Sequence, residues 1–116
     1  TVVGDEVFAS LVEFQGAKRH KATRDWRLGY FEGNLQFMPF QLPKKIAHRC
    51  VTLTKELGLS FGAIDLIQDK NGKIWFLEIN PNGQWAFIEE ATGQPIGKAV
   101  ARLLKTRQNP ITPAKR

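Results

Sequence analysis

Residues 61–80 decide the fold of this chain and read FGAIDLIQDKNGKIWFLEIN. Two runs rich in apolar and β-branched residues, 61–68 and 73–80, flank Asp69-Lys70-Asn71-Gly72. Asn-Gly between two such runs is the strongest short signal for a β-hairpin turn. The stretch therefore predicts two antiparallel strands joined by a tight turn.

The expected register of this hairpin brings acidic side chains together. With a two-residue turn, Asp65 lies directly opposite Glu78, and Asn80 lies on the same face, because side chains alternate along a strand. With a four-residue loop, Asp65 lies opposite Phe76 and Glu78 becomes its diagonal neighbour on the same face. Only an odd slip of the register would separate the two carboxylates.

The two faces of the predicted hairpin differ in polarity. Ile67, Ile74 and Phe76 are expected on the face of the carboxylates, so part of that face is covered. The opposite face is expected to be wholly apolar and to consist of Ile64, Leu66, Trp75, Leu77 and Ile79. A hairpin with apolar residues on both faces rarely carries acidic residues on one of them if that face is only a solvent-exposed surface without a function.

Opposed carboxylates need compensation, because like charges with Cβ atoms roughly 5 Å apart destabilise a sheet. A shared proton, a divalent cation or full exposure to solvent would each relieve the repulsion. Asp65, Glu78 and Asn80 offer hard oxygen donors, which suit Mg²⁺, Mn²⁺ or Ca²⁺ rather than Zn²⁺ or Cu²⁺. The residues favour a metal site with open positions for substrate phosphates. There is no Walker loop, so Mg²⁺ and arginines would have to hold such phosphates.

The rest of the chain predicts strands before the hairpin and helices around it. We expect a strand over residues 7–14 that pairs with residues 1–3 through the turn at Gly4-Asp5. Residues 15–25 are expected to form a loop, and residues 34–41 an irregular apolar segment that packs against something.

Two helices are predicted from apolar spacing. Pro43 and Gly58 bound the first, over residues 43–58. Its expected apolar stripe is Ile46, Cys50, Leu53 and Leu57, which makes Cys50 a buried structural thiol. A short turn or helix ending at Gly93 precedes the second helix, over residues 94–105. The expected stripe of that helix is Ile96, Ala99, Val100, Leu103 and Leu104.

Composition narrows the class of protein. The chain has 116 residues, which is the length of a single domain. Its formal net charge of +6 favours an anionic partner such as nucleic acid, nucleotide phosphates or an acidic peptide. Its single cysteine cannot form an internal disulfide, so we expect a cytoplasmic protein. No apolar run approaches the roughly 20 residues of a membrane-spanning helix, and no membrane partner is expected.

The motif FGAIDL followed by NGKIWFLEINPNGQW resembles the metal-binding hairpin of the ATP-grasp ligases. The resemblance implies that Asp65, Glu78 and Asn80 are the Mg²⁺ ligands of the D…ExN signature, with ATP and two Mg²⁺ ions as cofactors. The opening VVGDEVFA is similar to the strand pair that begins the larger, C-terminal lobe of these enzymes. The fold class expected is thus α+β: an antiparallel sheet with the metal-binding hairpin at 61–80, backed by helices.

The same resemblance assigns further residues. Asp25-Trp26-Arg27 is similar to the segment whose arginine contacts the triphosphate, so Arg27 would be catalytic and ATP-binding, with Arg24 as a weaker ATP-binding candidate. Ile67 is a candidate floor for the nucleotide base. Asn82 and Gln84 are expected to shape the loop beyond the metal.

EINPNGQW followed by IEEATGQPI is most similar to the peptide-modifying branch of the family, the microviridin-type (graspetide) ligases, which are related to ribosomal-protein glutamate ligases. This implies activation of a peptide Asp or Glu carboxylate as an acylphosphate, followed by attack of a hydroxyl or amine, in macrocyclisation of a RiPP precursor. The expected partners are the precursor peptide, the N-terminal part of the enzyme and a second copy of the chain.

The expected domain division is a C-terminal ATP-grasp lobe over residues 1–105 and a flexible tail over residues 106–116. Such a lobe is an incomplete enzyme and is expected to be inactive alone. Another ATP-grasp ligase, such as a glutamate ligase, is an alternative. A non-catalytic module that docks a leader peptide or binds nucleic acid is the alternative of another class. A steep loss of affinity with salt would favour nucleic acid, which we do not expect as the partner.

Overall fold

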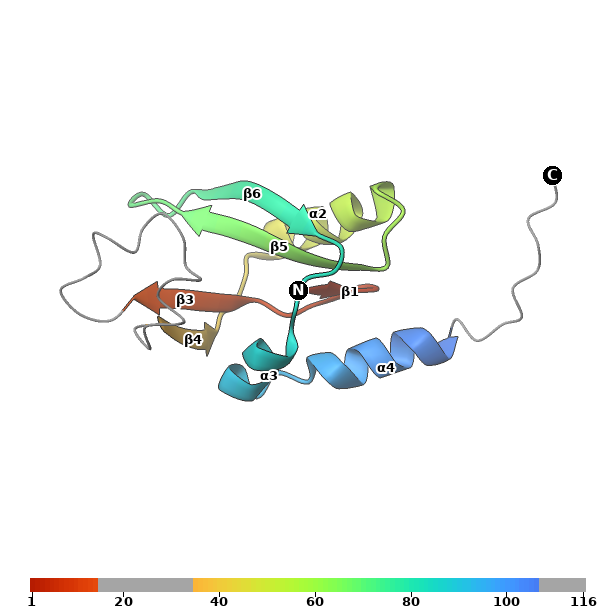
Figure 1. Ribbon diagram of the computed structural model, residues 1–116. Coiled ribbons are helices and arrows are strands. Elements are labelled where there is room, and N and C mark those ends of the chain that lie inside the picture. Colours follow the sequence, from red (N-terminus) through yellow and green to blue (C-terminus); the bar gives the residue numbers. More distant parts are fainter. Residues whose placement is uncertain (15–34, 107–116) are drawn as a thin grey trace.

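The computed structural model describes residues 1–14 and 35–106, and within these ranges the chain has the predicted α+β class (Figure 1). Two antiparallel sheets are present in the described part. The first has the strand order β2-β1-β5-β6, with β1 (Val2–Val3), β2 (Glu6–Val7), β5 (Phe61–Gln68) and β6 (Ile74–Asn80). The second pairs β3 (Ser10–Phe14) with β4 (Leu35–Pro39).

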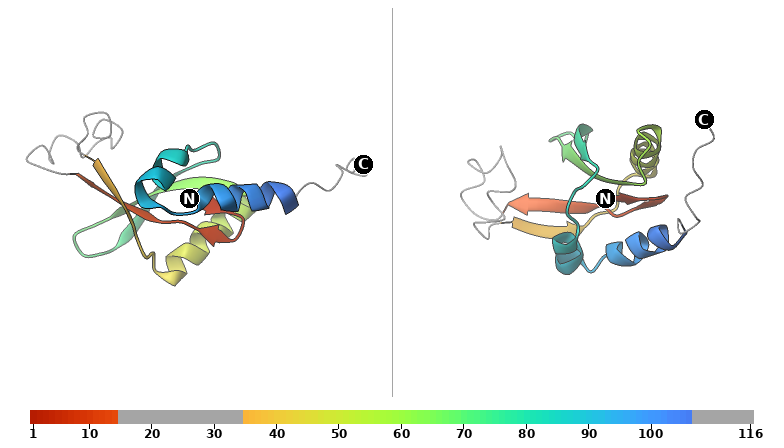
Figure 2. Two further views of the ribbon diagram at one scale, coloured as in Figure 1. Left: turned by 90° about the horizontal axis from the view of Figure 1, so that it is seen from below. Right: turned by 45° about the vertical axis from the view of Figure 1, so that its right-hand side comes forward.

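Helices lie on both faces of the first sheet: α2 (Lys44–Glu56) on one side of β1, and α4 (Ile96–Thr106) on the other, preceded by α3 (Ala86–Thr92) (Figures 1 and 2). A Cβ on Gly62 would point at Thr54 of α2, 3.5 Å from its hydroxyl oxygen. Val3 on the opposite face packs against Ile96 and Ala99 of α4. Because successive strand residues face opposite ways, β1 and β5 contribute one set of side chains to each helix.

The buried core lies between β1, β5 and α4. Val3, Ile96 and Ala99 are at most 2% exposed, and partly buried side chains pack around them, including Phe8, Phe61 and Trp85. Phe61 belongs to the hairpin strand β5, so this core fixes the base of the hairpin. The α4 helix therefore covers the near end of the hairpin face that also carries Asp65.

The single strand expected over residues 7–14 is divided in two. β2 pairs with β1, and β3 pairs with β4. The change of partner occurs at two hydrogen bonds, from the Phe8 amide to the Thr1 carbonyl and from the Phe40 amide to the Ala9 carbonyl. The prediction of an irregular segment over residues 34–41 is wrong, because β3 gives residues 35–39 a partner for a regular ladder.

The two predicted helices and the stop of α3 at Gly93 are confirmed, with boundaries shifted by one or two residues. Two stripe residues were predicted wrongly: Leu57 is 54% exposed and Leu104 is 64% exposed. Thr54 is buried in place of Leu57, and its hydroxyl donates to the Cys50 carbonyl at 2.7 Å. This bond satisfies the buried hydroxyl and lets a polar residue occupy the apolar side of α2.

Helices long and apolar enough to cross a membrane are absent from the described ranges.

Candidate functional site

The turn of the β5–β6 hairpin is held by Asp69. The Asp69 amide donates to the Lys73 carbonyl at 2.9 Å, and the Gly72 amide donates to the Asp69 carbonyl at 3.0 Å. One carboxylate oxygen of Asp69 also accepts from the amides of Asn71 and Lys73, both at 2.9 Å. Gly72 has φ 81°, a left-handed conformation that glycine adopts without strain. The loop thus comprises Lys70, Asn71 and Gly72, which is neither of the predicted lengths.

A β-bulge compensates for this odd loop length. From the turn inwards, Gln68 pairs with Ile74 and Leu66 with Phe76, a register that would separate the two carboxylates if it continued. The ladder is irregular between Asp65 and Leu66, where Leu77 is the extra residue. Beyond it, Asp65 lies opposite Glu78 and Ala63 lies opposite Asn80. The predicted opposition of Asp65 and Glu78 is therefore confirmed, although the turn differs.

The slip between the turn and the bulge reverses the predicted faces of the outer part of β6. Trp75 pairs with Ile67, so it lies on the side of Asp65, whereas Phe76 pairs with Leu66 on the opposite side. Ile74 pairs with Gln68 and also lies on that opposite side. We use the name candidate metal face for the side that carries Asp65, Ile67, Trp75, Glu78 and Asn80.

The candidate metal face is open over its outer half. Asp65 is half-buried, Glu78 and Asn80 are exposed, and Ile67 and Trp75 are 48% and 50% exposed. The carboxamide oxygen of Asn80 accepts a hydrogen bond from the Asn82 amide at 2.9 Å, which orients this side chain. A face that carries both carboxylates and exposed apolar groups suits a ligand with a charged end and an apolar end.

The donor set of this face fits a hard divalent cation. Asp65 and Glu78 are cross-strand partners, and Asn80 adds an amide oxygen one alternation further along β6. The described residues contain no cluster of three or more His, Cys, Asp or Glu side chains that could hold a metal ion. A cation here would thus have two carboxylates and an amide from the hairpin, and would take its remaining ligands from phosphates or water.

Several predicted site residues cannot be placed on this face. Arg24 and Arg27, with the basic stretch around them, lie outside the described residues. Asn82 and Gln84 are exposed in the loop after β6. The next residue after Asn82, Gly83, lies against Ala63, so this loop folds over the candidate metal face at its inner end.

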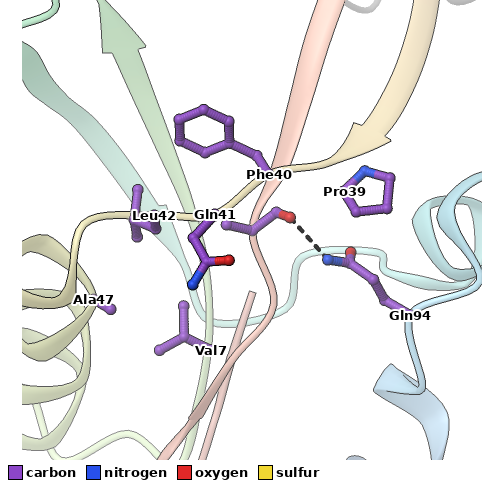
Figure 3. Close-up of a pocket in the computed structure, with 8 residues that line it drawn as sticks. Val7, Pro39, Phe40, Gln41, Leu42, Ala47 and Gln94 are labelled. Carbon is purple, nitrogen blue, oxygen red and sulfur yellow. Dashed lines mark hydrogen bonds between the residues drawn. The ribbon is translucent and has the colours of Figure 1, made fainter.

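A shallow pocket of about 440 Å³ lies elsewhere, between the β2–β3 connection, the segment after β4 and the start of α2 (Figure 3). Gln94 closes one side of it and donates to the Ala9 carbonyl at 2.8 Å. A second pocket, of about 430 Å³, is lined by residues 84–87. Neither of these two pockets includes Asp65, Glu78 or Asn80.

The sequence analysis missed a cluster at the hairpin tip. The Trp75 indole N–H donates to the second carboxylate oxygen of Asp69 at 3.0 Å, and the Lys73 ammonium lies 4.3 Å from the centre of the Trp75 ring. The hydrogen bond from Trp75, followed by those from the Lys73 and Asn71 amides, lowers the pKa of the Asp69 carboxyl. The available signal in the sequence was the Asp-Lys-Asn-Gly loop with an aromatic residue shortly after it. Whether the side chains of Asp69 and Trp75 lie on the same face depends on the register of the hairpin, which the sequence did not determine.

Solved structures similar to this chain include a macrocyclase and ATP-grasp ligases. The macrocyclase MdnC from Microcystis aeruginosa MRC, bound with precursor peptide MdnA, has a TM-score of 0.70 and 34% identity over 90% of this chain and 31% of its own. A RiPP-associated ATP-grasp ligase from Chryseobacterium gregarium, in complex with ADP and a leader and core peptide, has a TM-score of 0.75 and 28% identity over 93% of this chain and 32% of its own.

The ATP-grasp ligase PsnB, in complex with a phosphomimetic variant of its minimal precursor, Mg and ADP, has a TM-score of 0.67. At 17% identity this likeness shows the fold alone. No family model and no curated protein matches the sequence. The resemblance to RiPP ATP-grasp ligases is nevertheless confirmed by the solved structures, and the chain spans about a third of the length of the ones described here.

Proposed function

We propose that this chain supplies the Mg²⁺- and ATP-binding face of a ligase that joins a peptide carboxylate to a hydroxyl or amine. The observation that carries the proposal is the opposition of Asp65 and Glu78 across a bulged hairpin, with Asn80 on the same face. The similar structures support it, because one of these ligases contains ADP with a leader and core peptide. These neighbours support the ligase class, and the bond formed, C–O or C–N, is a further part of the proposal.

The proposed reaction has two steps. A carboxylate oxygen of a peptide Asp or Glu attacks the γ-phosphorus of ATP, the bond to the β,γ-bridging oxygen breaks, and ADP leaves. A hydroxyl or amine of the peptide then attacks the carbonyl carbon of the acylphosphate, loses its proton and displaces phosphate. The product is an ester or an amide, which closes a ring when both groups belong to one precursor peptide.

The role of the chain in these steps is electrostatic. Mg²⁺, when bound, neutralises charge on the phosphate oxygens during transfer. Asp65 and Glu78 would hold the cation from opposite strands, and Asn80 would add a neutral oxygen from a side chain already oriented by the Asn82 amide. Ile67 would contact the nucleotide base. Arg27, outside the described residues, would offer a planar fork that matches phosphate geometry.

We assign residues 1–105 to one lobe of the enzyme. For activity, this lobe would need the remaining domains, which would contact the adenine and the phosphates of ATP. Two Mg²⁺ ions, a flexible tail over residues 106–116 and a homodimer stay predictions.

The test is Glu78→Gln in the complete enzyme, with Glu90→Gln as the matched control. Both variants remove one exposed carboxylate, but Glu90 lies on α3 outside the candidate metal face. We expect Glu78→Gln to lower ligation by roughly 10²-fold or more, the scale of losing one strong electrostatic contact, while Glu90→Gln keeps full turnover. Without metal, Glu78→Gln is expected to leave the free energy of unfolding unchanged or raised, because a like charge opposite Asp65 is removed.

Two results would contradict the proposal. Full turnover of Glu78→Gln would show that the hairpin does not carry the metal. A Glu78→Gln protein that is destabilised without Mg²⁺ and loses activity only in proportion would show that Glu78 has a structural role.

A further inference from the structure

Trp75 is a half-exposed aromatic side chain held in a fixed orientation on the candidate metal face. Its indole N–H is bound to Asp69 at 3.0 Å, and the Lys73 ammonium lies 4.3 Å from its ring centre. Half of the Trp75 surface remains open to solvent. An aromatic ring that is both anchored and exposed loses little conformational entropy when a flat ligand stacks on it.

The position of Trp75 relative to the carboxylates suits the base of a nucleotide. Trp75 is the cross-strand partner of Ile67, and Ile67 lies two residues from Asp65 along β5. This row is therefore about 7 Å from the Asp65–Glu78 row, since a strand rises roughly 3.3 Å per residue. A nucleotide whose terminal phosphates bind a cation at the carboxylates can span this separation with its ribose and α-phosphate.

We propose that Trp75 stacks on the base of the bound nucleotide and forms, with Ile67, a two-residue platform for it. The inference rests on the proposed function, in which Asp65 and Glu78 hold the metal-bound phosphates. Trp75 is thus a positioning residue for the nucleotide.

Lys73 and Asp69 both contact the indole of Trp75. Lys73 lies between the turn and the start of β6, and its ammonium lies over the indole ring, 4.3 Å from the ring centre. Trp75 pairs with Ile67 across the ladder, so both side chains lie on the side of the sheet that carries Asp65 and Glu78. Asp69 fixes the rotation of the ring through its bond to the indole N–H.

The bulge provides a matched control residue. Phe76 is the neighbour of Trp75 in sequence and is equally exposed, at 52% against 50%, but it pairs with Leu66 on the opposite face. Trp75→Leu and Phe76→Leu each remove one exposed aromatic ring from the same strand. A general effect of aromatic loss on the hairpin would appear in both variants, whereas an effect of base stacking would appear only in Trp75→Leu.

The experiment measures dissociation constants of Mg²⁺-ADP and of Mg²⁺-tripolyphosphate, which lacks a base, for the complete enzyme by calorimetry. We expect Trp75→Leu to weaken ADP binding about tenfold or more, the scale of one base–aromatic stack, and to leave tripolyphosphate binding unchanged. Phe76→Leu should change neither constant. Trp75→Phe, which keeps a ring but loses the bond to Asp69, should recover most of the ADP affinity.

Each other outcome decides against the inference. Equal weakening of both ligands by Trp75→Leu would mean a distorted hairpin, and unchanged ADP binding would mean that the base lies elsewhere. Loss of precursor-peptide binding alone would make Trp75 a peptide contact. If the unmodified enzyme binds neither ligand with Mg²⁺, the proposed function itself fails, which the Glu78→Gln turnover test detects separately.

Discussion

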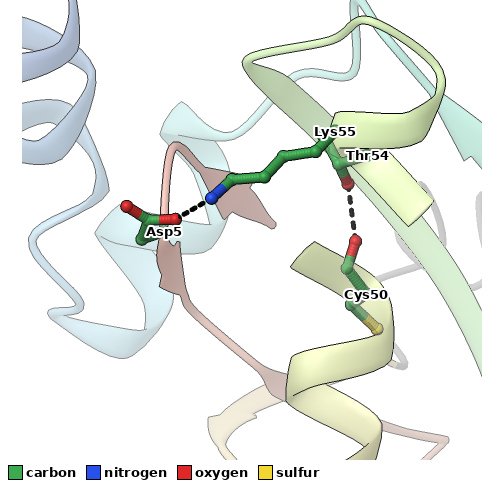
Figure 4. A network of polar contacts seen from close by, with 4 residues as sticks. All are labelled: Asp5, Cys50, Thr54 and Lys55. Carbon is green, nitrogen blue, oxygen red and sulfur yellow. Dashed lines mark hydrogen bonds and ion pairs between the residues drawn. The ribbon is translucent and has the colours of Figure 1, made fainter. Parts of the chain in front are cut away.

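Two polar contacts of α2 are drawn in Figure 4: a buried hydrogen bond within the helix and an exposed ion pair that links the helix to the β1–β2 turn. The Thr54 hydroxyl donates to the Cys50 carbonyl at 2.7 Å, and Lys55 next to it forms an ion pair with Asp5 in the β1–β2 turn. Cys50 is 8% exposed, which confirms its predicted burial, and this burial raises the pKa of its thiol. A protonated, buried thiol is a poor nucleophile, so Cys50 acts as a packing residue.

Asp69 makes the stability of the hairpin depend on pH. Its pKa is lowered from the ordinary 3.8, chiefly by the hydrogen bond from Trp75, so the folded state binds this proton more weakly than the unfolded state. The stabilisation is therefore complete above 3.8 and is lost as the pH falls through the lower folded value. We expect Asp69→Asn to be less stable than wild type at neutral pH, with a difference that shrinks in acid.

Denaturant unfolding of wild type and Asp69→Asn at a series of pH values measures this difference. If the difference stayed constant or grew in acid, the charge of Asp69 would not be what holds the turn.

At the scale of the elements, the sequence predicted the β5–β6 hairpin but not its internal irregularity. Asn71-Gly72 and the alternation around it indicated a hairpin, and the opposition of Asp65 and Glu78 was predicted correctly. The three-residue loop and the bulge at Leu77 each shift the register by one and cancel for Asp65, so the wrong turn still led to the right pair. Trp75 lies between the two irregularities, and its face could therefore not be deduced from parity.

The loop after β6 approaches β5 so closely that only glycine fits. A Cβ on Gly83 would lie 2.2 Å from the Cβ of Ala63, so Gly83→Ala must displace the loop or the strand. We expect this variant to lower the free energy of unfolding by about 1–3 kcal/mol, the usual cost of overpacking, measured by chemical denaturation.

Ala63→Gly/Gly83→Ala is the matching control, because it removes the opposing Cβ. A double-mutant cycle should show positive coupling, with the double variant more stable than the sum of the single changes predicts. Strictly additive losses would mean that the two residues do not meet.

At the scale of the whole molecule, the sequence predicted the class and the helices but not how the strands divide. The chain breaks between β2 and β3, and β3 then pairs with β4, which lies more than twenty residues away in sequence. Local propensity contains no information on such a long-range pairing. Without the β3 partner, the sequence of residues 35–39 predicts an irregular segment, and only the long-range pairing makes it a strand. The candidate metal residues were accessible from sequence because they lie on one hairpin, whereas Arg24 and Arg27 depend on a long-range placement.

The net charge of the chain allows a test that separates nucleotide binding from nucleic-acid binding. A formal charge of +6 is compatible with both. Binding through two carboxylates needs a divalent cation, whereas binding of a polyanion to basic residues needs none and weakens steeply with salt. In the complete enzyme we therefore expect Mg²⁺-ADP at 100 times its dissociation constant to raise the free energy of unfolding by about 2.7 kcal/mol.

Removing the metal with a chelator should abolish this stabilisation, as should Glu78→Gln, while Glu90→Gln should preserve it because Glu90 lies outside the candidate metal face. Raising the salt concentration should affect it only weakly, since Asp65 and Glu78 are cross-strand partners and would hold the cation at short range, where screening is small. In the opposite pattern, chelation has no effect and single-stranded nucleic acid stabilises the protein only at low salt. That result would assign anion binding to the basic residues of the chain instead of the hairpin. Thermal and chemical unfolding with each ligand distinguishes the two patterns, because only the ligase interpretation makes a pair of acidic residues the determinant of anion binding.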